Sequence, residues 1–160
     1  RHVKMINTPL EALLLNNRGL QHRTLRRYDL SSADYSRAIQ ICPEYSLAYN
    51  NRGFANEMES NLDAAFADYC QAIVHCPTFA LPYANRADIL YMREQYDESI
   101  ADLKKCLELD PSCINAYETR YNLYDTLQCL VASCSDLSIF AEDYRMLLKE
   151  IHAHGEDPLF

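Results

Sequence analysis

The sequence predicts an all-α array of antiparallel helix hairpins, because its strongest regularity is a repeat of 34 residues. Prolines recur at this spacing as Pro43, Pro77 and Pro111, each after a run of apolar residues with helical spacing. Three triplets keep the same spacing: Asn17-Arg18-Gly19, Asn51-Arg52-Gly53 and Asn85-Arg86-Ala87. One period has room for a helix, a turn and a return helix, so each repeat is predicted to be one hairpin.

The apolar spacing within each period defines the helices in order. The first has Thr8 as its expected cap, Pro9 at its first position and Glu11 three residues after the cap. The second helix of each repeat ends at its proline, which lacks an amide hydrogen and disfavours helical geometry in the residue before it. We expect no strands, and helices at 9–24, 30–42, 46–59, 63–76, 80–93, 97–110, 113–127 and 133–152.

The same period divides the chain into repeats. The fourth repeat diverges, with Tyr121 where a small residue is expected and Phe140 in place of an alanine. Its second helix is expected to run on as a terminal cap, since end repeats need an altered outer face. The predicted divisions are a lead-in at 1–11, repeats at 12–45, 46–79 and 80–113, a divergent repeat with capping helix at 114–153, and a tail at 154–160.

This phasing resembles the tetratricopeptide repeat over about residues 12–147. The aromatic residue that the family carries early in its first helix stands here as Tyr49, Tyr83 and Tyr117. Its small residue in that helix stands as Gly19, Gly53 and Ala87, and its second-helix alanine as Ala38 and Ala72, with Cys106 in the third copy. The resemblance implies a right-handed superhelical solenoid whose concave face is lined by the first helix of each repeat.

Each repeat also has an arginine sixteen residues before an aspartate. Sixteen residues span one helix, the turn and part of the return helix, so the two side chains can meet across the hairpin. A guanidinium at a position that is usually aliphatic is costly unless it is paired. We interpret the pairs as structural, with a ligand site as the alternative: Arg18–Asp34, Arg52–Asp68, Arg86–Asp102 and Arg120–Asp136.

Helical geometry and the resemblance assign a set of side chains to the groove. Three of them, Asn17, Asn51 and Asn85, form a ladder one repeat apart, and an amide both donates and accepts hydrogen bonds. Such a ladder can bind the backbone of an extended peptide, although asparagine at this phase could simply be a soluble residue typical of the repeat. The groove residues are Asn16, Asn17, Leu20, Arg23, Asn50, Asn51, Phe54, Glu57, Asn85, Asp88, Tyr91, Glu118, Asn122 and Asp125.

The resemblance also permits a test for the dicarboxylate clamp, with which related adaptors grip a C-terminal Glu-Glu-Val-Asp. Clamp positions that need lysine, asparagine, lysine and arginine are occupied here by Asn16, Leu20, Leu81 and Asn85, and only Asn51 fits. Carboxylates would find no cationic partner there, so we expect no binding of chaperone tails. The acidic groove residues instead favour a partner segment with basic side chains, unless they serve only solubility.

Composition excludes several classes of function. A formal net charge of −8 with only 15 Lys+Arg disfavours nucleic acid, and 3 glycines disfavour phosphate-binding loops. No apolar run is long enough to span a membrane, and no residues form a catalytic or metal-ligating set, so we expect no enzyme, metal or cofactor. Seven cysteines without a C-x-x-C pair indicate reduced thiols and a cytoplasmic or nuclear location.

The prediction for function is a non-catalytic scaffold or adaptor module that binds a peptide segment of a partner protein in the groove. One alternative is a structural module that associates through its convex face or its ends, including with itself. Another is the regulatory arm of a larger enzyme, since the chain opens at Arg1 and we expect it to be part of a longer protein.

Overall fold

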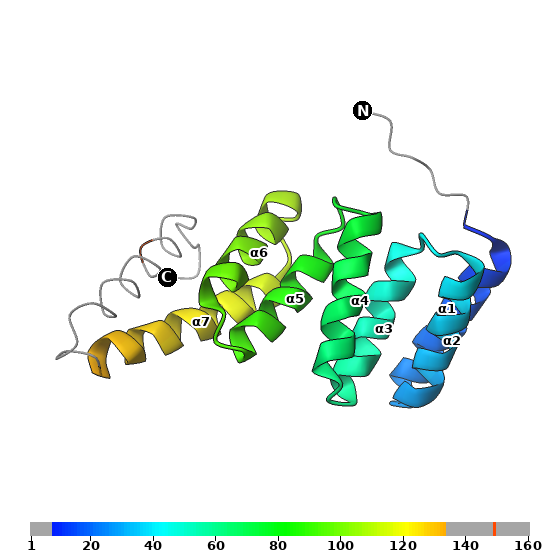
Figure 1. Cartoon of the computed structure of the whole chain (residues 1–160), viewed down its shortest axis with the longest axis horizontal. Coiled ribbons are helices and arrows are strands. Elements are labelled where there is room, and N and C mark those ends of the chain that lie inside the picture. Colours follow the sequence, from blue (N-terminus) through cyan, green and yellow to red (C-terminus); the bar gives the residue numbers. More distant parts are fainter. Residues whose placement is uncertain (1–7, 134–148, 150–160) are drawn as a thin grey trace. The chain divides into compact units, whose positions relative to one another are not determined.

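The computed structural model describes residues 8–133 and 149, and in this part of the chain it contains helices and no strands (Figure 1). The all-α prediction is therefore confirmed. The first six helices begin and end within two residues of the predicted bounds. The seven helices are α1 Leu10–Thr24, α2 Tyr28–Ile41, α3 Ser46–Met58, α4 Leu62–His75, α5 Leu81–Met92, α6 Tyr96–Leu109 and α7 Ile114–Ser133.

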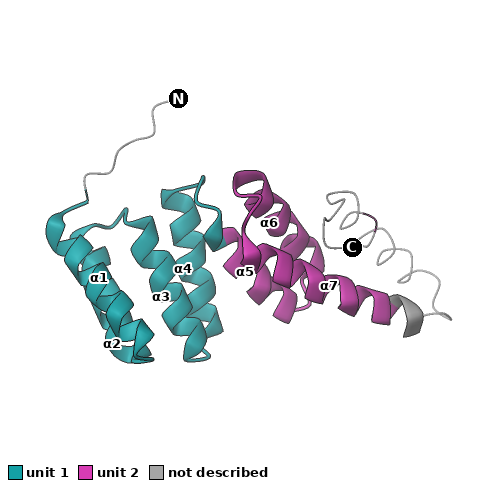
Figure 2. Cartoon of the chain, turned by 180° about the vertical axis from the view of Figure 1, so that it is seen from behind, with its two compact units in different colours: residues 1–82 teal, residues 83–160 magenta. Residues whose placement is uncertain are grey.

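The chain divides into two compact units, residues 1–82 and 83–160, which we call unit 1 and unit 2 (Figure 2). In unit 1, α1 packs against α2, α2 against α3, and α3 against α4, so the two hairpins are continuous. The core of its first hairpin includes Ala12, Leu15 and Ala38. In unit 2, α6 packs against α7, and Leu123 and Leu127 are fully buried.

Within each hairpin, the two helices approach closely at the small residue of the first helix. The Ser31 hydroxyl donates to the Gly19 carbonyl oxygen at 3.0 Å, and in the third hairpin the Ser99 hydroxyl donates to the Ala87 carbonyl oxygen at 2.8 Å. Both serines are fully buried. The tyrosine ring of the second helix explains the glycine, since a Cβ at Gly19 would lie only 2.5 Å from Cε1 of Tyr35.

The turns inside the three hairpins share one geometry. Arg26, Ser60 and Glu94 have φ of 57°, 63° and 59°, and they are spaced by the repeat period. Around Glu94, the amide of Gln95 donates to the Leu90 carbonyl oxygen and the amide of Glu94 donates to the Tyr91 carbonyl oxygen, both at 2.9 Å. This pair of bonds is a Schellman motif, which usually has glycine at the left-handed position.

We expect Glu94→Gly to raise the free energy of unfolding by about 0.5–1 kcal/mol. Glycine removes the left-handed penalty of roughly 1–2 kcal/mol, and its greater freedom in the unfolded chain cancels only part of this gain. Urea denaturation measures the change. Glu98→Gly, at a helical position in α6, is the matched control and should lower stability. If both substitutions destabilise the protein equally, the turn geometry described here is wrong.

The fourth repeat departs from this pattern. Gln128 lies one repeat period after Glu94, the left-handed residue of the third turn. Helix α7 nevertheless continues through Gln128 to Ser133, although the helix was predicted to end at 127. Apolar side chains explain the extension, because Leu123, Leu127 and Leu130 keep one helix face in contact with a single cluster. The predicted capping helix at 133–152 and the tail at 154–160 lie outside the described residues.

The predicted cap of the first helix is wrong. Helix α1 begins at Leu10, its N-cap residue is Pro9, and no side chain caps it with a hydrogen bond. Thr8 instead lines a pocket near the start of α3. Thr8 lies one residue before the N-cap, because the helix begins one residue later than the sequence pattern predicts.

Candidate functional site

Three of the four predicted Arg–Asp pairs are present. Arg52 donates to Asp68 through Nε at 2.9 Å and Nη2 at 2.6 Å, and the pairs Arg18–Asp34 and Arg86–Asp102 each have an Nε–Oδ2 distance of 2.7 Å. Each pair joins the two helices of one hairpin. Asp136, the partner predicted for Arg120, lies outside the described residues.

The surroundings of the arginines differ in a way that the sequence analysis missed. Arg52 and Arg86 lie over the rings of Tyr49 and Tyr83, at 5.6 Å and 5.8 Å from the ring centroids. The tyrosine three residues before each arginine is the sequence signal for this contact. The first repeat has Leu15 there, and the side chain of Arg18 is 55% exposed, against 25% for Arg52.

These pairs also shift the pKa of Asp34 and of Arg52. The hydrogen bonds from Arg18 hold the pKa of Asp34 below its ordinary value, against the opposing effect of burial. The hydrogen bond to Asp68 raises the pKa of Arg52. Both effects favour the charged forms, so the pairs act as buried or half-buried links within hairpins.

The asparagines predicted for the groove fall into two groups. Asn51 donates through Nδ2 to Oδ1 of Asn16 at 2.9 Å, which links α3 to α1. Asn16, Asn50 and Asn51 are 2%, 3% and 4% exposed, whereas Asn17 is exposed. The first three amides therefore lie in the helix interface, and of the groove asparagines described in unit 1 only Asn17 presents its side chain to solvent.

A surface of mixed character remains on α1 and α3. The guanidinium of Arg23 lies over the Phe54 ring, 5.1 Å from its centroid, and Tyr69 donates to Glu57 Oε2 at 2.7 Å. Two leucines that the sequence analysis missed, Leu13 and Leu47, are 38% and 40% exposed. We call this surface the first-helix face of unit 1, and it consists of Leu13, Asn17, Leu20, Arg23, Leu47, Phe54 and Glu57.

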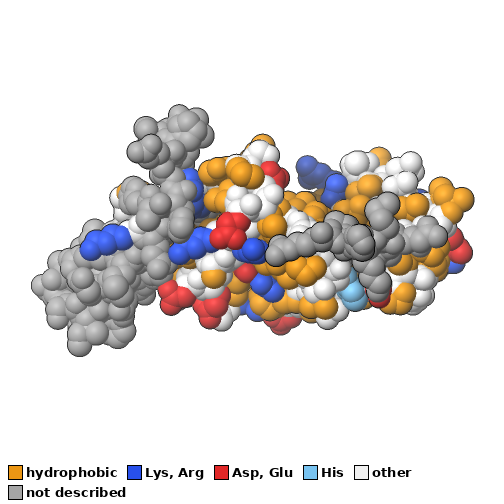
Figure 3. All heavy atoms as spheres, turned by 90° about the horizontal axis from the view of Figure 1, so that it is seen from above, with side chains coloured by type: hydrophobic (Ala, Val, Ile, Leu, Met, Phe, Trp, Pro, Cys, Tyr) orange, Lys and Arg blue, Asp and Glu red, His pale blue; other side chains and the backbone are white. Residues whose placement is uncertain are grey.

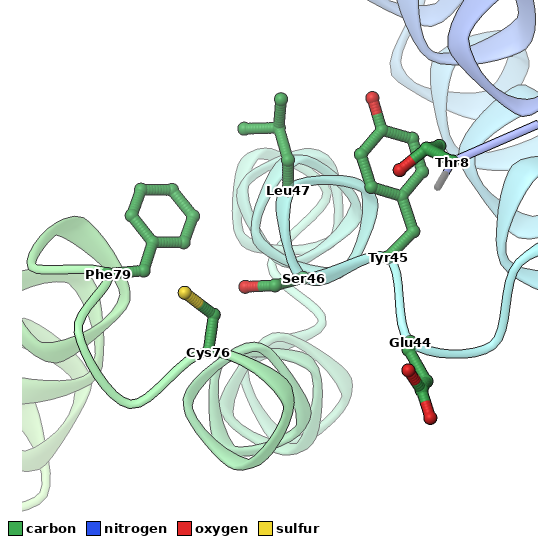
Figure 4. Close-up of a pocket in the computed structure, with 7 residues that line it drawn as sticks. All are labelled: Thr8, Glu44, Tyr45, Ser46, Leu47, Cys76 and Phe79. Atoms are coloured by element: carbon green, nitrogen blue, oxygen red, sulfur yellow. The ribbon is translucent and has the colours of Figure 1, made fainter. Parts of the chain in front are cut away.

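Leu47 also lines a pocket of about 340 Å³ at the start of α3. Figure 4 shows the Tyr45 and Phe79 rings on either side of Leu47. Thr8, Glu44, Ser46 and Cys76 complete its lining, and the Ser46 hydroxyl donates to the Ala72 carbonyl oxygen at 2.9 Å. Hydrophobic side chains are exposed over α1–α4 in the view of Figure 3. The pocket therefore extends the apolar part of the first-helix face.

In unit 2, three side-chain hydrogen bonds join α5 to α7. Asn115 donates to Asn85 at 3.2 Å, Thr119 donates to Asp88 at 3.3 Å, and the hydroxyls of Tyr91 and Thr126 lie 2.9 Å apart. We call this surface the first-helix face of unit 2, and its remaining predicted groove residues are all exposed: Glu118, Asn122 and Asp125.

Asp88 is the partly buried carboxyl group of that face. Burial raises its pKa most, Glu118 raises it further, and the hydrogen bond from Thr119 lowers it. An ionised Asp88 therefore carries a desolvation cost, which a cationic group placed beside it would reduce.

A metal centre and a membrane-spanning helix are both absent from the described residues. They contain no group of three His, Cys, Asp or Glu side chains that could hold a metal ion. No helix among them is long and apolar enough to cross a membrane. Six of the seven cysteines are described, and all six are thiols that form no disulfide.

The helix hairpins define the class of protein, which is an α-helical repeat protein in which each repeat is one hairpin. The family model of the tetratricopeptide repeat matches residues 80–113, which is the third repeat. No curated protein sequence matches the chain. Residues 80–113 therefore match the tetratricopeptide repeat, and the other hairpins of the described residues share the fold of such repeats.

Solved structures with the same fold include the first tetratricopeptide-repeat domain of Spaghetti (RPAP3) bound to the HSP90 peptide SRMEEVD. It has 20% identity and a TM-score of 0.69, over 74% of this chain and 94% of that chain. The tetratricopeptide-repeat domain of Arabidopsis OM64 has 19% identity and a TM-score of 0.69, over 72% and 96%. The Sgt2 domain from Aspergillus fumigatus has 16% identity and a TM-score of 0.70, over 75% and 81%.

Proposed function

We propose that the chain is a non-catalytic protein-interaction module, and that it binds a segment of a partner protein on its first-helix faces. One observation carries the proposal: exposed leucines lie beside an exposed amide on the first-helix face of unit 1. Leu13 and Leu47 are 38% and 40% exposed, and Asn17 is exposed one helical turn after Leu13 in α1. Apolar anchors with a few oriented polar groups are typical of peptide-binding surfaces.

The comparisons support the class of ligand but not its identity. Spaghetti (RPAP3) shares the fold and binds the peptide SRMEEVD through its first domain. In this chain, two features argue against a ligand of that dicarboxylate type. Asn16 occupies a clamp position that needs lysine and is buried, and Asn51, the residue that fits the clamp, donates to Asn16. A pair of carboxylates at the clamp positions would therefore be unpaired.

Charge suggests what the partner segment carries over unit 2. Glu118 and Asp125 are exposed, and burial raises the pKa of Asp88, so its ionised form carries a desolvation cost. A lysine or arginine of the partner would offset that cost, and the effect should appear mainly in the association rate and its salt dependence. We further propose that the protein acts as a scaffold or adaptor in the cytoplasm or nucleus, where its cysteines stay reduced.

The test is selection of binding peptides from a random display library, followed by affinity measurement. In the double variant Asn17→Ala, Leu47→Ala, we expect the selected peptides to bind about 10- to 100-fold more weakly, since one hydrogen bond and one apolar contact are lost. Asn51→Ala is unsuitable, because it would leave the buried Asn16 oxygen without its donor.

The matched control is the double variant Leu30→Ala, Val74→Ala, which truncates exposed side chains on the second helices α2 and α4. It should leave the affinity unchanged. If this control releases the peptides and the first variant retains them, the chain associates through another surface. The structural module that associates through its convex face or its ends then replaces the proposal. Failure to select any peptide also counts against the proposal.

A further inference from the structure

Two buried side-chain atoms of the described residues have no hydrogen-bond partner, and both belong to the first hairpin. They are Tyr35 Oη and His22 Nδ1. The Tyr35 side chain is fully buried. A tyrosine hydroxyl that is removed from water without a partner destabilises the folded chain. The second hairpin avoids this cost at the equivalent place.

There, the Tyr69 hydroxyl donates to Glu57 Oε2 at 2.7 Å. Tyr69 follows Tyr35 by one repeat period, and Glu57 follows Arg23 by the same period. The first hairpin therefore has an arginine where the second has the carboxylate that accepts the tyrosine proton. A guanidinium has no acceptor atom, so Arg23 cannot replace Glu57 in this bond.

Arg23 itself has no carboxylate partner among the described residues. Its guanidinium lies over the Phe54 ring of the next hairpin, 5.1 Å from the centroid. Arg23 has the phase at which Glu57 reaches the tyrosine hydroxyl of the second hairpin. Burial raises the pKa of Tyr35, and the charge of Arg23 opposes this effect. The Ser31 hydroxyl also lies near Tyr35, but it donates its proton to the Gly19 carbonyl oxygen and forms no hydrogen bond with Tyr35 Oη.

We propose that Tyr35 and Arg23 form a binding site for one carboxylate of the partner segment. The carboxylate accepts the Tyr35 hydroxyl proton in a hydrogen bond and pairs with the Arg23 guanidinium, and it takes the place that the Glu57 carboxylate has in the second hairpin. The carboxylate comes from an Asp or Glu side chain or from a free C-terminus. This inference rests on the proposed function, because Arg23 and Phe54 belong to the first-helix face of unit 1.

The Tyr69–Glu57 bond of the second hairpin is the model for the chemistry of this site. In the second hairpin, a carboxylate and a tyrosine hydroxyl meet at 2.7 Å at this phase, so the backbone spacing of the hairpin accommodates the pair. In the first hairpin, the cation beside the hydroxyl adds a charge-assisted partner for the incoming anion. The site differs from the dicarboxylate clamp, because it takes one carboxylate and uses neither of the clamp's lysine positions.

The first experiment titrates small probes into the 160-residue chain and follows the arginine Nε–H signals by NMR. The probes are N-acetylglutamate amide for a side-chain carboxylate, N-acetylalanine for a C-terminal carboxylate, and N-acetylglutamine amide as the uncharged control. We expect the Arg23 signal to shift to saturation with at least one carboxylate probe and not with the amide. The probe with the higher affinity identifies the source of the carboxylate.

Two variants separate the site from general charge attraction. Tyr35→Phe removes only the unpartnered hydroxyl, so it should not lower the melting temperature, and it should weaken the carboxylate probe about tenfold. Tyr69→Phe is the matched control and should leave probe affinity unchanged, because its hydroxyl already donates to Glu57. An unchanged affinity in Tyr35→Phe, or equal shifts at Arg18, Arg26 and Arg27, overturns the proposal.

Arg23→Glu gives a second, independent readout. It copies the pattern of the second hairpin, so its carboxylate should accept the Tyr35 proton. The variant should melt at a higher temperature than Arg23→Gln and should no longer bind the carboxylate probe. A lower melting temperature than that of Arg23→Gln contradicts the inference. If the probes fail while Asn17→Ala, Leu47→Ala still weakens selected peptides, the inference fails and the proposed function stands.

Discussion

Gly53→Ala should lower the free energy of unfolding by about 2 kcal/mol, although alanine is the better helix former by about 1 kcal/mol. A Cβ at this position would lie 2.6 Å from Cε1 and 2.9 Å from Cδ1 of Tyr69. Tyr69 is fully buried and its hydroxyl is held by Glu57, so the ring cannot move without losing packing or a hydrogen bond. The overlap therefore outweighs the gain in helix propensity.

The third hairpin supplies the control for this prediction, because it pairs Ala87 with Leu103 at the two equivalent positions. The double variant Gly53→Ala, Tyr69→Leu should be more stable than the sum of the two single changes predicts, with a coupling above about 1 kcal/mol. Urea denaturation of the four proteins in the cycle measures this coupling. Additive effects would mean that the glycine and the tyrosine ring do not compete for space.

Asp68→Ala should lower the free energy of unfolding by about 3 kcal/mol, within the range for removing one partner of a buried ion pair. Asp68 is 4% exposed and accepts hydrogen bonds from Nε and Nη2 of Arg52 and, at 3.0 Å, from Nδ2 of Asn56. Its removal leaves three donors without an acceptor. The side chain of Arg52 is only 25% exposed, so water replaces the carboxylate incompletely.

The matched control is Asp34→Ala in the first hairpin, which should cost less. The side chain of its partner Arg18 is 55% exposed, and water can solvate the released guanidinium. Thermal and urea unfolding of both variants at neutral pH measure the difference. If Asp34→Ala is as damaging as Asp68→Ala, the exposure of the arginine does not decide the energy of the pair.

The Arg18–Asp34 pair also has a defined pH dependence. Arg18 lowers the pKa of Asp34 in the folded protein, so the pair stabilises the fold fully above the unfolded pKa. This contribution is lost as the pH falls through the lower, folded pKa. The stability difference between the wild-type protein and Asp34→Ala should therefore shrink in acid, below about pH 4.

The fold was predictable because its signals are local and recur. The prolines and the apolar spacing mark the helix ends, and the Arg–Asp spacing predicted a contact across each hairpin. The Schellman turns were not predictable, because Arg26, Ser60 and Glu94 are not the glycine that usually marks a left-handed residue. The length of α7 depends on packing against an apolar cluster, which has no local signal.

The candidate site was predictable only in part. Helical phase placed Asn17 and Asn51 at equivalent positions, but Asn51 is buried by its contact with Asn16 of the preceding hairpin, and Asn17 is exposed. Burial in a repeat array depends on the neighbouring repeat, which phase alone ignores. The unpartnered hydroxyl of Tyr35 could not be predicted either, because it is recognised only by comparison with the Tyr69–Glu57 bond of the second hairpin.

The most direct test of the central claim is to map the binding site of a library-selected peptide by backbone amide hydrogen exchange and NMR shift changes in the complex. Binding on the first-helix faces predicts changes concentrated around Asn17, Leu47 and Phe54, with residues around Leu30 and Val74 unaffected. Changes centred instead on the second helices α2 and α4 would contradict the account and assign binding to the opposite side of the hairpins.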